Sequence, residues 1–277
     1  MRALVALALD ALGVGPRVAL RAVAALLALG LLTSGCVMTT VAGDQAREST
    51  PGEKAEARRN VGIDHLVNGR TAMAIRELKH AVTLNPADPV SHHWLGEAYR
   101  RRGLLAPAEE HISLALDSDP SYHEVRLSLS ALYIQMKRYE ESIEHARVLV
   151  DDPVFSTPWR ALTNIGWAQL QLGQRAEARV SLEDALDFSP RYWPARLNLG
   201  ILESVERNHV AAMDHFQAVL ELGLGGGAEA EVNFRMAEIY VSLGRRDEAL
   251  RHFEVALEQS PHGRWGKRSK EYMRLLR

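Results

Sequence analysis

The stretch from Leu95 to Pro120 reads LGEAYRRRGLLAPAEEHISLALDSDP, and its pattern of small and large residues recurs along the chain. One small residue stands at the same place in each of six copies. These residues are Gly62, Gly96, Ser130, Gly166, Gly200 and Ala237. Their successive separations are 34, 34, 36, 34 and 37 residues. A nearly constant period of this length is typical of proteins built from stacked structural repeats.

The period and its residues resemble those of tetratricopeptide repeats, in which each copy is a pair of helices joined by a turn. The clearest copies carry Leu95, Gly96, Tyr99, Ala108, Ala115 and Pro120, and Tyr240, Gly244, Ala249, Phe253, Ala256 and Pro261. The third and fifth copies are degenerate. We therefore expect an all-α fold without a sheet, a tetratricopeptide-repeat solenoid of six helix pairs over residues 55–262.

Packing explains why small residues recur. They let the first helix of a pair approach the second, while large residues of the neighbouring repeat fill the remaining space. Asp88-Pro89 and Thr157-Pro158 each predict an N-cap followed by proline in the first helical turn. Residues 263–277 are expected to form a C-terminal capping helix, because the last repeat has no neighbour to cover it. That helix, from Gly266 onward, is expected to bury Tyr272, Leu275 and Leu276.

Composition argues against two classes of function. The chain has 277 residues and a formal net charge of -2, which gives no electrostatic footprint for nucleic acid binding. It contains a single cysteine, Cys36, so that an intrachain disulfide and a cysteine-based metal cluster are both excluded.

The residues before Cys36 predict an export signal. Arg17 and Arg21 precede an apolar run from Ala22 to Leu32, and small residues follow it. The run is shorter than the about 20 apolar residues that a membrane-spanning helix needs. Small residues directly before a lone cysteine resemble the lipobox of bacterial lipoproteins. An ordinary secretory signal with a chance cysteine is the alternative.

The lipobox resemblance implies that residues 1–35 are a signal peptide and that Cys36 carries diacylglycerol on its sulfur and a fatty acid, such as palmitate, on its amine. Residues 36–54 are rich in Thr, Ser, Gly and charge, and we expect them to be a lipidated flexible tether. Val37 is not the aspartate that holds lipoproteins at the inner membrane of enteric bacteria. We therefore expect lipid anchoring in the outer membrane, facing the periplasm.

No pattern points to catalysis, a cofactor or a metal ion. His111, His145, His215 and His252 occupy the same place in four repeats, but helices of different repeats lie about 10 Å apart, too far to share one zinc ion. The run GLGGG at 223–227 follows no strand, so we interpret it as a loop insertion. The basic tail after Gly263 either meets an acidic lipid or peptidoglycan, or is the solvated face of a capping helix.

The concave face of such a solenoid is built mainly from the first helix of each pair, and it is the candidate partner groove. Apolar residues at helical spacing on these segments predict that the groove is apolar and takes an extended or helical segment of another protein. The candidates are Ile63, Leu66, Leu127, Ala131, Ile134, Trp167, Leu170, Leu197, Ile201, Phe234 and Val241. The alternative is that the superhelix itself buries some of them.

The repeat period slips by two residues in the stretch DDPVFSTPWRALTNIGW, from Asp151 to Trp167. The residues Asp152, Pro153, Phe155, Thr157, Pro158 and Asn164 resemble the D-P-x-[FY]-x-T-P connector of type IV pilus biogenesis lipoproteins of the PilF, PilW or Tgl type. This resemblance implies a six-repeat, outer-membrane pilotin that helps the pilus secretin reach the outer membrane and multimerise there. The connector either is a hinge that sets the curvature of the groove or is a tolerated loop insertion.

Two hypotheses follow for function. The first is a non-enzymatic pilotin that is lipid-anchored at Cys36, binds type IV pilus secretin subunits through its groove and supports twitching or social gliding motility. The second is a general tetratricopeptide-repeat scaffold lipoprotein of another cell-envelope assembly complex. An enzyme would need a hydrolytic constellation of side chains on the concave face.

Overall fold

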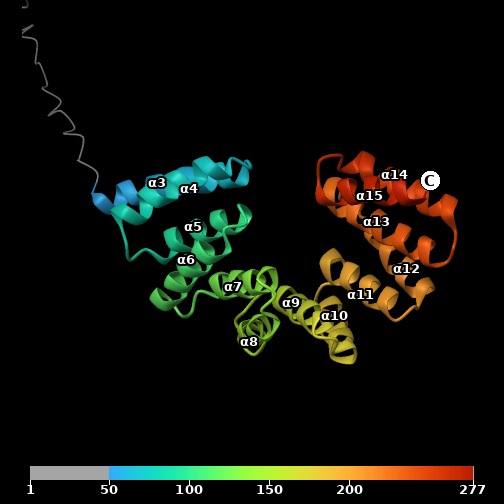
Figure 1. The fold of residues 1–277 in the computed structure, drawn as a ribbon. Helices are drawn as coiled ribbons and strands as arrows, with labels where there is room; N and C mark the ends of the chain where they lie inside the picture. Colours follow the sequence, from blue (N-terminus) through green and yellow to red (C-terminus); the bar gives the residue numbers. More distant parts are fainter. Residues whose placement is uncertain (1–49, 277) are drawn as a thin grey trace, which may run out of the picture. The chain divides into compact units, whose positions relative to one another are not determined.

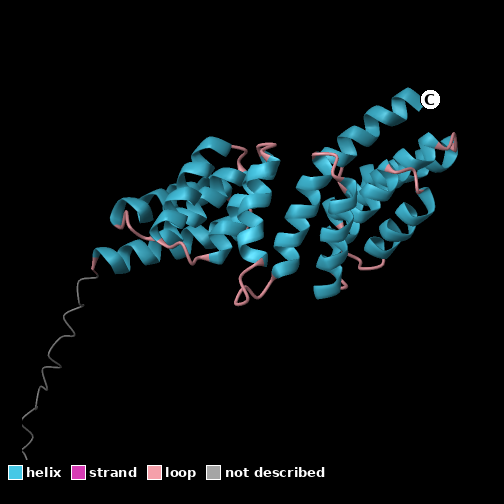
Figure 2. Ribbon diagram, turned by 90° about the horizontal axis from the view of Figure 1, so that it is seen from below, coloured by secondary structure: helices cyan, strands magenta, loops and turns pink. Residues whose placement is uncertain are grey.

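The computed structural model describes residues 50–276. The predicted signal peptide, Cys36 and most of the predicted tether lie outside these residues, and their assignments stay predictions. The described residues form helices joined by loops, without a strand (Figure 2). In chain order the helices are α3 (Pro51–Val67), α4 (Thr71–Leu84), α5 (Pro89–Arg101), α6 (Leu105–Ser118), α7 (His123–Gln135), α8 (Tyr139–Val150), α9 (Pro158–Gln171), α10 (Arg175–Phe188), α11 (Trp193–Val205), α12 (His209–Leu220), α13 (Gly226–Ser242), α14 (Arg246–Gln259) and α15 (Arg264–Leu276).

These helices confirm the predicted fold class. From α3 to α14 they form six pairs, each pair packs against the next, and α15 packs on α13 and α14 (Figure 1). The first helix begins at Pro51, ahead of the expected boundary at residue 55. Thr50 and Glu53 explain the earlier start, because they form a capping box in which each side chain accepts from the other residue's backbone N–H.

The aligned small residues are the points of closest approach within a pair. A Cβ atom built on Gly96 would lie 2.5 Å from Cγ1 of Ile112, and one on Gly200 would lie 2.5 Å from Cε1 of Phe216. Real Cβ atoms do not come this close to another carbon. At Gly96 and Gly200 an added Cβ would therefore force the facing side chain of the second helix to shift.

The turn inside each pair explains part of the degeneracy of repeats three and five. Four of the six turns place a glycine in the left-handed region, Gly69, Gly103, Gly173 and Gly244. In repeats three and five Lys137 and Arg207 take this position, with φ values of 62° and 63°. Side chains other than glycine adopt this conformation at a cost in free energy.

The apolar core consists of clusters, most of which bridge neighbouring repeats. One cluster joins α6 to α7 through residues such as Ile112 and Leu132, and another joins α8 to α9 through Leu149 and Ile165. These two clusters thus use residues of two neighbouring repeats, as a solenoid requires. All the clusters lie within the compact unit Thr50–Arg277. This unit therefore has its own hydrophobic core, as an independently folding domain does.

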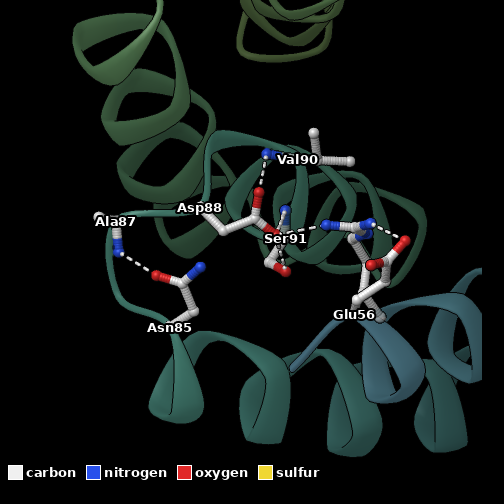
Figure 3. Close-up of polar contacts among 7 residues, drawn as sticks. Glu56, Asn85, Ala87, Asp88, Val90 and Ser91 are labelled. Carbon is white, nitrogen blue, oxygen red and sulfur yellow. Dashed lines mark hydrogen bonds and ion pairs between the residues drawn. The ribbon is translucent and has the colours of Figure 1, made fainter. Parts of the chain in front are cut away.

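The predicted cap at Asp88 is confirmed and also ties two repeats together. Its carboxylate accepts from the backbone N–H groups of Val90 and Ser91, both at 3.2 Å, and from the Ser91 hydroxyl at 2.6 Å (Figure 3). Arg59 of α3 donates to the same carboxylate at 2.7 Å. Burial alone would raise the pKa of Asp88, but these hydrogen bonds and the Arg59 charge hold it below its usual range.

Thr157 stands at the predicted N-cap position of α9, but without a side-chain capping hydrogen bond. Pro158 stands in the first turn, as expected. The threonine Oγ1 is buried without a partner in the described residues. The backbone of Thr157, with ψ at 52°, lies outside the extended region that Asp88 adopts as an N-cap.

The C-terminal helix caps the last repeat as expected, but one predicted contact is wrong. Tyr272 and Leu276 pack against the core of repeat six, together with the buried residues Trp265 and Met273. Leu275 is 84% exposed. It points away because the buried face of α15 is centred on Trp265, Ser269 and Met273, four residues apart. None of the helices in the described part is long and apolar enough to cross a membrane.

Candidate protein-binding cleft

The first helices of successive pairs lie side by side. Helix α5 contacts α7, α7 contacts α9, α9 contacts α11, and α11 contacts α13. Residues at the same repeat position therefore form a row across these helices. One row follows the aligned small residues directly and consists of Glu97, Ala131, Trp167 and Ile201, all of which line clefts on this face.

Two adjoining depressions share Arg100, Ala131, Asn164 and Tyr192, and we call them together the central cleft. The larger part has a volume of about 320 Å³ and is lined by residues of α5, α7, α9, α11 and α13 and of the segment before α11. The smaller part has a volume of about 170 Å³ and lies toward the N-terminal repeats, with Glu97 and Arg160 in its wall. The cleft thus spans repeats two to six on one face of the unit.

Six of the eleven predicted groove residues line the central cleft. These residues are Leu127, Ala131, Ile134, Trp167, Leu197 and Ile201. Ile63 in α3 and Val241 in α13 are half-buried and lie outside it.

The structure places Leu66, Leu170 and Phe234 in the core rather than in a groove. Leu66 follows Gly62 by four residues, and Leu170 follows Gly166 by four. Each leucine therefore lies on the helix face that packs against its own pair partner. Phe234 is covered by α15, whose Trp265 and Tyr272 rings lie 5.1 Å and 5.4 Å from its own.

The prediction of an apolar groove missed its charged wall. Arg100 donates two hydrogen bonds to Glu97, at 3.0 Å and 2.7 Å, and Nη1 of Arg160 lies 3.0 Å from both carboxylate oxygens of Glu124. Burial would raise the pKa of Glu97, but the hydrogen bonds and charge of Arg100 keep it below its usual range. Tyr192 joins this wall, and burial raises the pKa of its phenol.

Two asparagines at equivalent repeat positions offer amide groups to the cleft. Asn164 and Asn198 each stand two residues before an aligned glycine, and both line the larger part. Asn164 donates to Oγ of Ser130 at 3.2 Å. Asn198 has no hydrogen-bond partner among the described residues. An amide side chain carries both a donor and an acceptor, so this row can bind the backbone of a peptide segment.

Ser128 lines the smaller part of the cleft and contacts a histidine of α5, which bears on the enzyme hypothesis. His93 Nε2 is 2.9 Å from Oγ of Ser128, and burial lowers the pKa of His93. Ser128 also lies close enough to the Glu97 carboxylate to help lower its pKa. No carboxylate orients His93, because its Nδ1 is buried without a partner in the described residues. The pair has the contacts of a structural network and lacks those of an activated nucleophile.

The repeated histidines pack against helix partners of their own repeats. The rings of Tyr99 and His111, Tyr133 and His145, and Tyr240 and His252 lie 5.7 Å, 5.4 Å and 5.3 Å apart. Burial lowers the pKa of His111, His145, His215 and His252. Within residues 50–276 no group of three or more His, Cys, Asp or Glu side chains has the arrangement of a metal site.

The connector between α8 and α9 is anchored at both ends. Asp152 binds His123 of α7 at 2.9 Å and accepts from the backbone of Val154 at 3.0 Å. Phe155 is buried in the cluster that α7, α8 and α9 share, and Pro158 opens α9. Pro153 lies between these anchors, after the end of α8. The inserted residues therefore form part of the joint between repeats three and four.

Known proteins share the repeats of this chain. Profiles of the tetratricopeptide repeat match residues 60–123, 163–229 and 230–262. The type IV pilus assembly protein PilF of Pseudomonas aeruginosa is 27% identical over 221 residues, which are 78% of this chain and 84% of that protein.

Solved structures share the fold. The structure of Pseudomonas aeruginosa PilF matches with a TM-score of 0.61 and 22% identity, over 80% of this chain and 99% of that one. The type IV pilus biogenesis factor PilW matches with a TM-score of 0.66 and 18% identity, over 77% and 96%. The APC/C assembly Cut9–Hcn1 matches with a TM-score of 0.68 and 18% identity, over 80% of this chain and 43% of that one. The chain belongs to the tetratricopeptide repeat family, and its relatives include type IV pilus biogenesis proteins.

Proposed function

We propose that this protein is an outer-membrane lipoprotein that acts as a pilotin for the type IV pilus secretin. The observation that carries the proposal is the similarity to a type IV pilus assembly protein across most of both chains. The connector residues Asp152 and Phe155, which carry the resemblance in the sequence, also join the repeats that form the cleft. In this role the protein binds secretin subunits and promotes their localisation and multimerisation in the outer membrane.

The central cleft is the proposed binding site for the secretin subunit. Ile134, Trp167 and Ile201 offer apolar surface, while Asn198 offers an unpartnered amide. Neighbouring packed helices lie about 10 Å apart, which matches three residues of a polyproline II segment at about 3.1 Å each. An extended segment can therefore meet successive repeats with successive turns of its backbone. We propose such a segment, with an apolar side chain in the larger part of the cleft.

The proposed anchor is lipid on Cys36, joined to the repeat unit by the tether. Two or more acyl chains give stable membrane association, because each buried methylene contributes about 0.8 kcal/mol. The role requires no catalysis, cofactor or metal ion. The buried Nδ1 of His93, the histidine beside Ser128, has no partner among the described residues, which supports a binding protein over a hydrolase.

The second candidate remains a scaffold lipoprotein of another envelope complex. The likeness to the Cut9–Hcn1 assembly, with a TM-score of 0.68, shows that the repeat fold alone does not specify a pilus partner. The two candidates differ in whether the secretin depends on the protein.

The test is the amount of heat-resistant secretin multimer in outer-membrane fractions of a deletion strain. We expect multimers to disappear on deletion and to return with the wild-type chain but not with Cys36→Ala. Multimers that persist without the protein would refute the pilotin role and favour the scaffold. Multimers that return fully with Cys36→Ala would refute the anchor.

A further inference from the structure

The outer face of α15 carries unpaired positive charge. Lys267, Lys270 and Arg274 are all exposed, and none of their side chains forms an ion pair or hydrogen bond with another described residue. They stand three and four residues apart, so they lie on one face of the helix. Glu271, the one carboxylate within α15, lies on the same face, four residues after Lys267 and three before Arg274, so the stripe keeps an excess of positive charge. This stripe is basic, although the whole chain has a formal net charge of -2.

Apolar groups lie beside these charges. Leu275 follows Arg274 and is 84% exposed. A cavity of about 210 Å³ between α14 and α15 is lined by Leu257, Lys270, Met273 and Arg274, so two of the cations stand beside an apolar hollow. Cations flanked by exposed apolar surface on an amphipathic helix are suited to the boundary between lipid headgroups and acyl chains.

The core contacts of α15 keep this face outward. Trp265 and Met273 are buried in the cluster of repeat six, and the Arg268 guanidinium lies 4.6 Å from the centre of the Phe234 ring. The helix is therefore held against α13 and α14 by its opposite side. The stripe can meet a partner without any rearrangement of the repeat.

We propose that the stripe of Lys267, Lys270 and Arg274 on α15 docks the repeat unit onto an anionic phospholipid surface, with Leu275 at the acyl boundary. Charge complementarity selects this partner, because three unpaired cations on one helix face match a plane of phosphate groups. The contact would be a second attachment besides any lipid anchor. It would orient the C-terminal repeat toward the membrane. It does not depend on the proposed pilus function.

Vesicle flotation tests this proposal with residues 50–277, which contain all the described helices and cores and lack Cys36. Vesicles contain phosphatidylcholine with about one third phosphatidylglycerol, or phosphatidylcholine alone. Each cation near an anionic surface contributes roughly a fivefold gain in affinity, so a Lys267→Glu, Lys270→Glu, Arg274→Glu variant is expected to bind on the order of a hundredfold more weakly. Binding of the wild type should also weaken at high salt.

The matched control reverses three other exposed cations without described partners, as Lys79→Glu, Arg175→Glu and Arg191→Glu. It changes the net charge equally but leaves α15 intact. We expect it to bind anionic vesicles within about threefold of the wild type, because these sites lie on other helices. Thermal unfolding of both variants should stay close to that of the wild type, since these side chains are exposed and none forms a described ion pair or hydrogen bond.

Three results would overturn the proposal: no binding of the wild type to anionic vesicles, equal binding to neutral vesicles, or equal losses in both variants. The secretin multimer assay is separate, because neither variant alters the central cleft. Failure of the pilotin role and failure of lipid docking are therefore distinguishable.

Discussion

Replacing Gly96 by alanine tests the close helix packing at the aligned glycines. The added Cβ would lie 2.5 Å from Cγ1 of Ile112 and 3.1 Å from the backbone oxygen of Ala108. Overpacking of this kind costs about 1–3 kcal/mol, whereas alanine gains about 1 kcal/mol over glycine in helix propensity. The net expectation is a loss of roughly 1 kcal/mol in the free energy of unfolding.

Gly227→Ala in α13 is the matched control, because nothing lies within 4 Å of its built Cβ. It should keep the propensity gain and stabilise the domain by up to about 1 kcal/mol. Urea unfolding followed by helical circular dichroism measures both variants. The expected difference between them is about 2 kcal/mol. Equal stabilities would refute the idea that the aligned glycines are required for close approach.

A double-mutant cycle identifies the clashing partner. Ile112→Ala alone should cost about 2–5 kcal/mol, because it empties a fully buried site. In the Ile112→Ala background, Gly96→Ala should cost less than it does in the wild type, since the nearest atom has gone. An unchanged cost would place the clash elsewhere.

Other predictions concern the turns, the connector and pH. Arg207→Gly should stabilise the domain by roughly 0.5–1 kcal/mol in the same unfolding assay, because it relieves a left-handed backbone at φ 63°; a loss of stability would contradict this. Phe155→Ala should lower the free energy of unfolding by about 3 kcal/mol, because the ring is buried in the joint between repeats. Val154→Ala changes a residue that is 75% exposed and should alter the free energy of unfolding by no more than about 0.5 kcal/mol. Similar values for both variants would indicate that the connector does not pack against the repeats. Burial lowers the pKa of His93, His111, His145, His215 and His252 in the folded state, so the unfolded chain binds more protons near the ordinary histidine pKa. The free energy of unfolding should therefore fall as pH drops from about 7.5 to 5.5, and a rise would contradict the direction of these shifts.

The repeat register and the six helix pairs could be predicted from the sequence, because helix packing requires small residues at fixed positions. Gly96 and Gly200 lie where only a small residue fits. The exposure of Leu275 could not be predicted as easily. The periodicity of α15 allows several apolar faces, and the choice depends on where Trp265 meets Phe234.

The polar wall of the cleft can be predicted in part from the repeat alignment. Glu124 and Arg160 each stand six residues before an aligned small residue, so the side-by-side packing of α7 and α9 brings them together. Comparing equivalent positions of the aligned repeats identifies this pair and the row of asparagines. The hydrogen bonds of Ser128 leave no such trace, because they depend on side-chain geometry.

Secretin multimerisation in a strain that carries Ile134→Glu tests the role of the central cleft most directly. Ile134 lines the cleft and belongs to none of the described core clusters, so the change places a charge in the binding site without opening the core. Val210→Glu is the matched control, because Val210 is 78% exposed on α12. We predict that heat-resistant multimers are lost with Ile134→Glu and kept with Val210→Glu at equal protein levels. Full multimer formation with Ile134→Glu would contradict the assignment of the central cleft as the secretin-binding site.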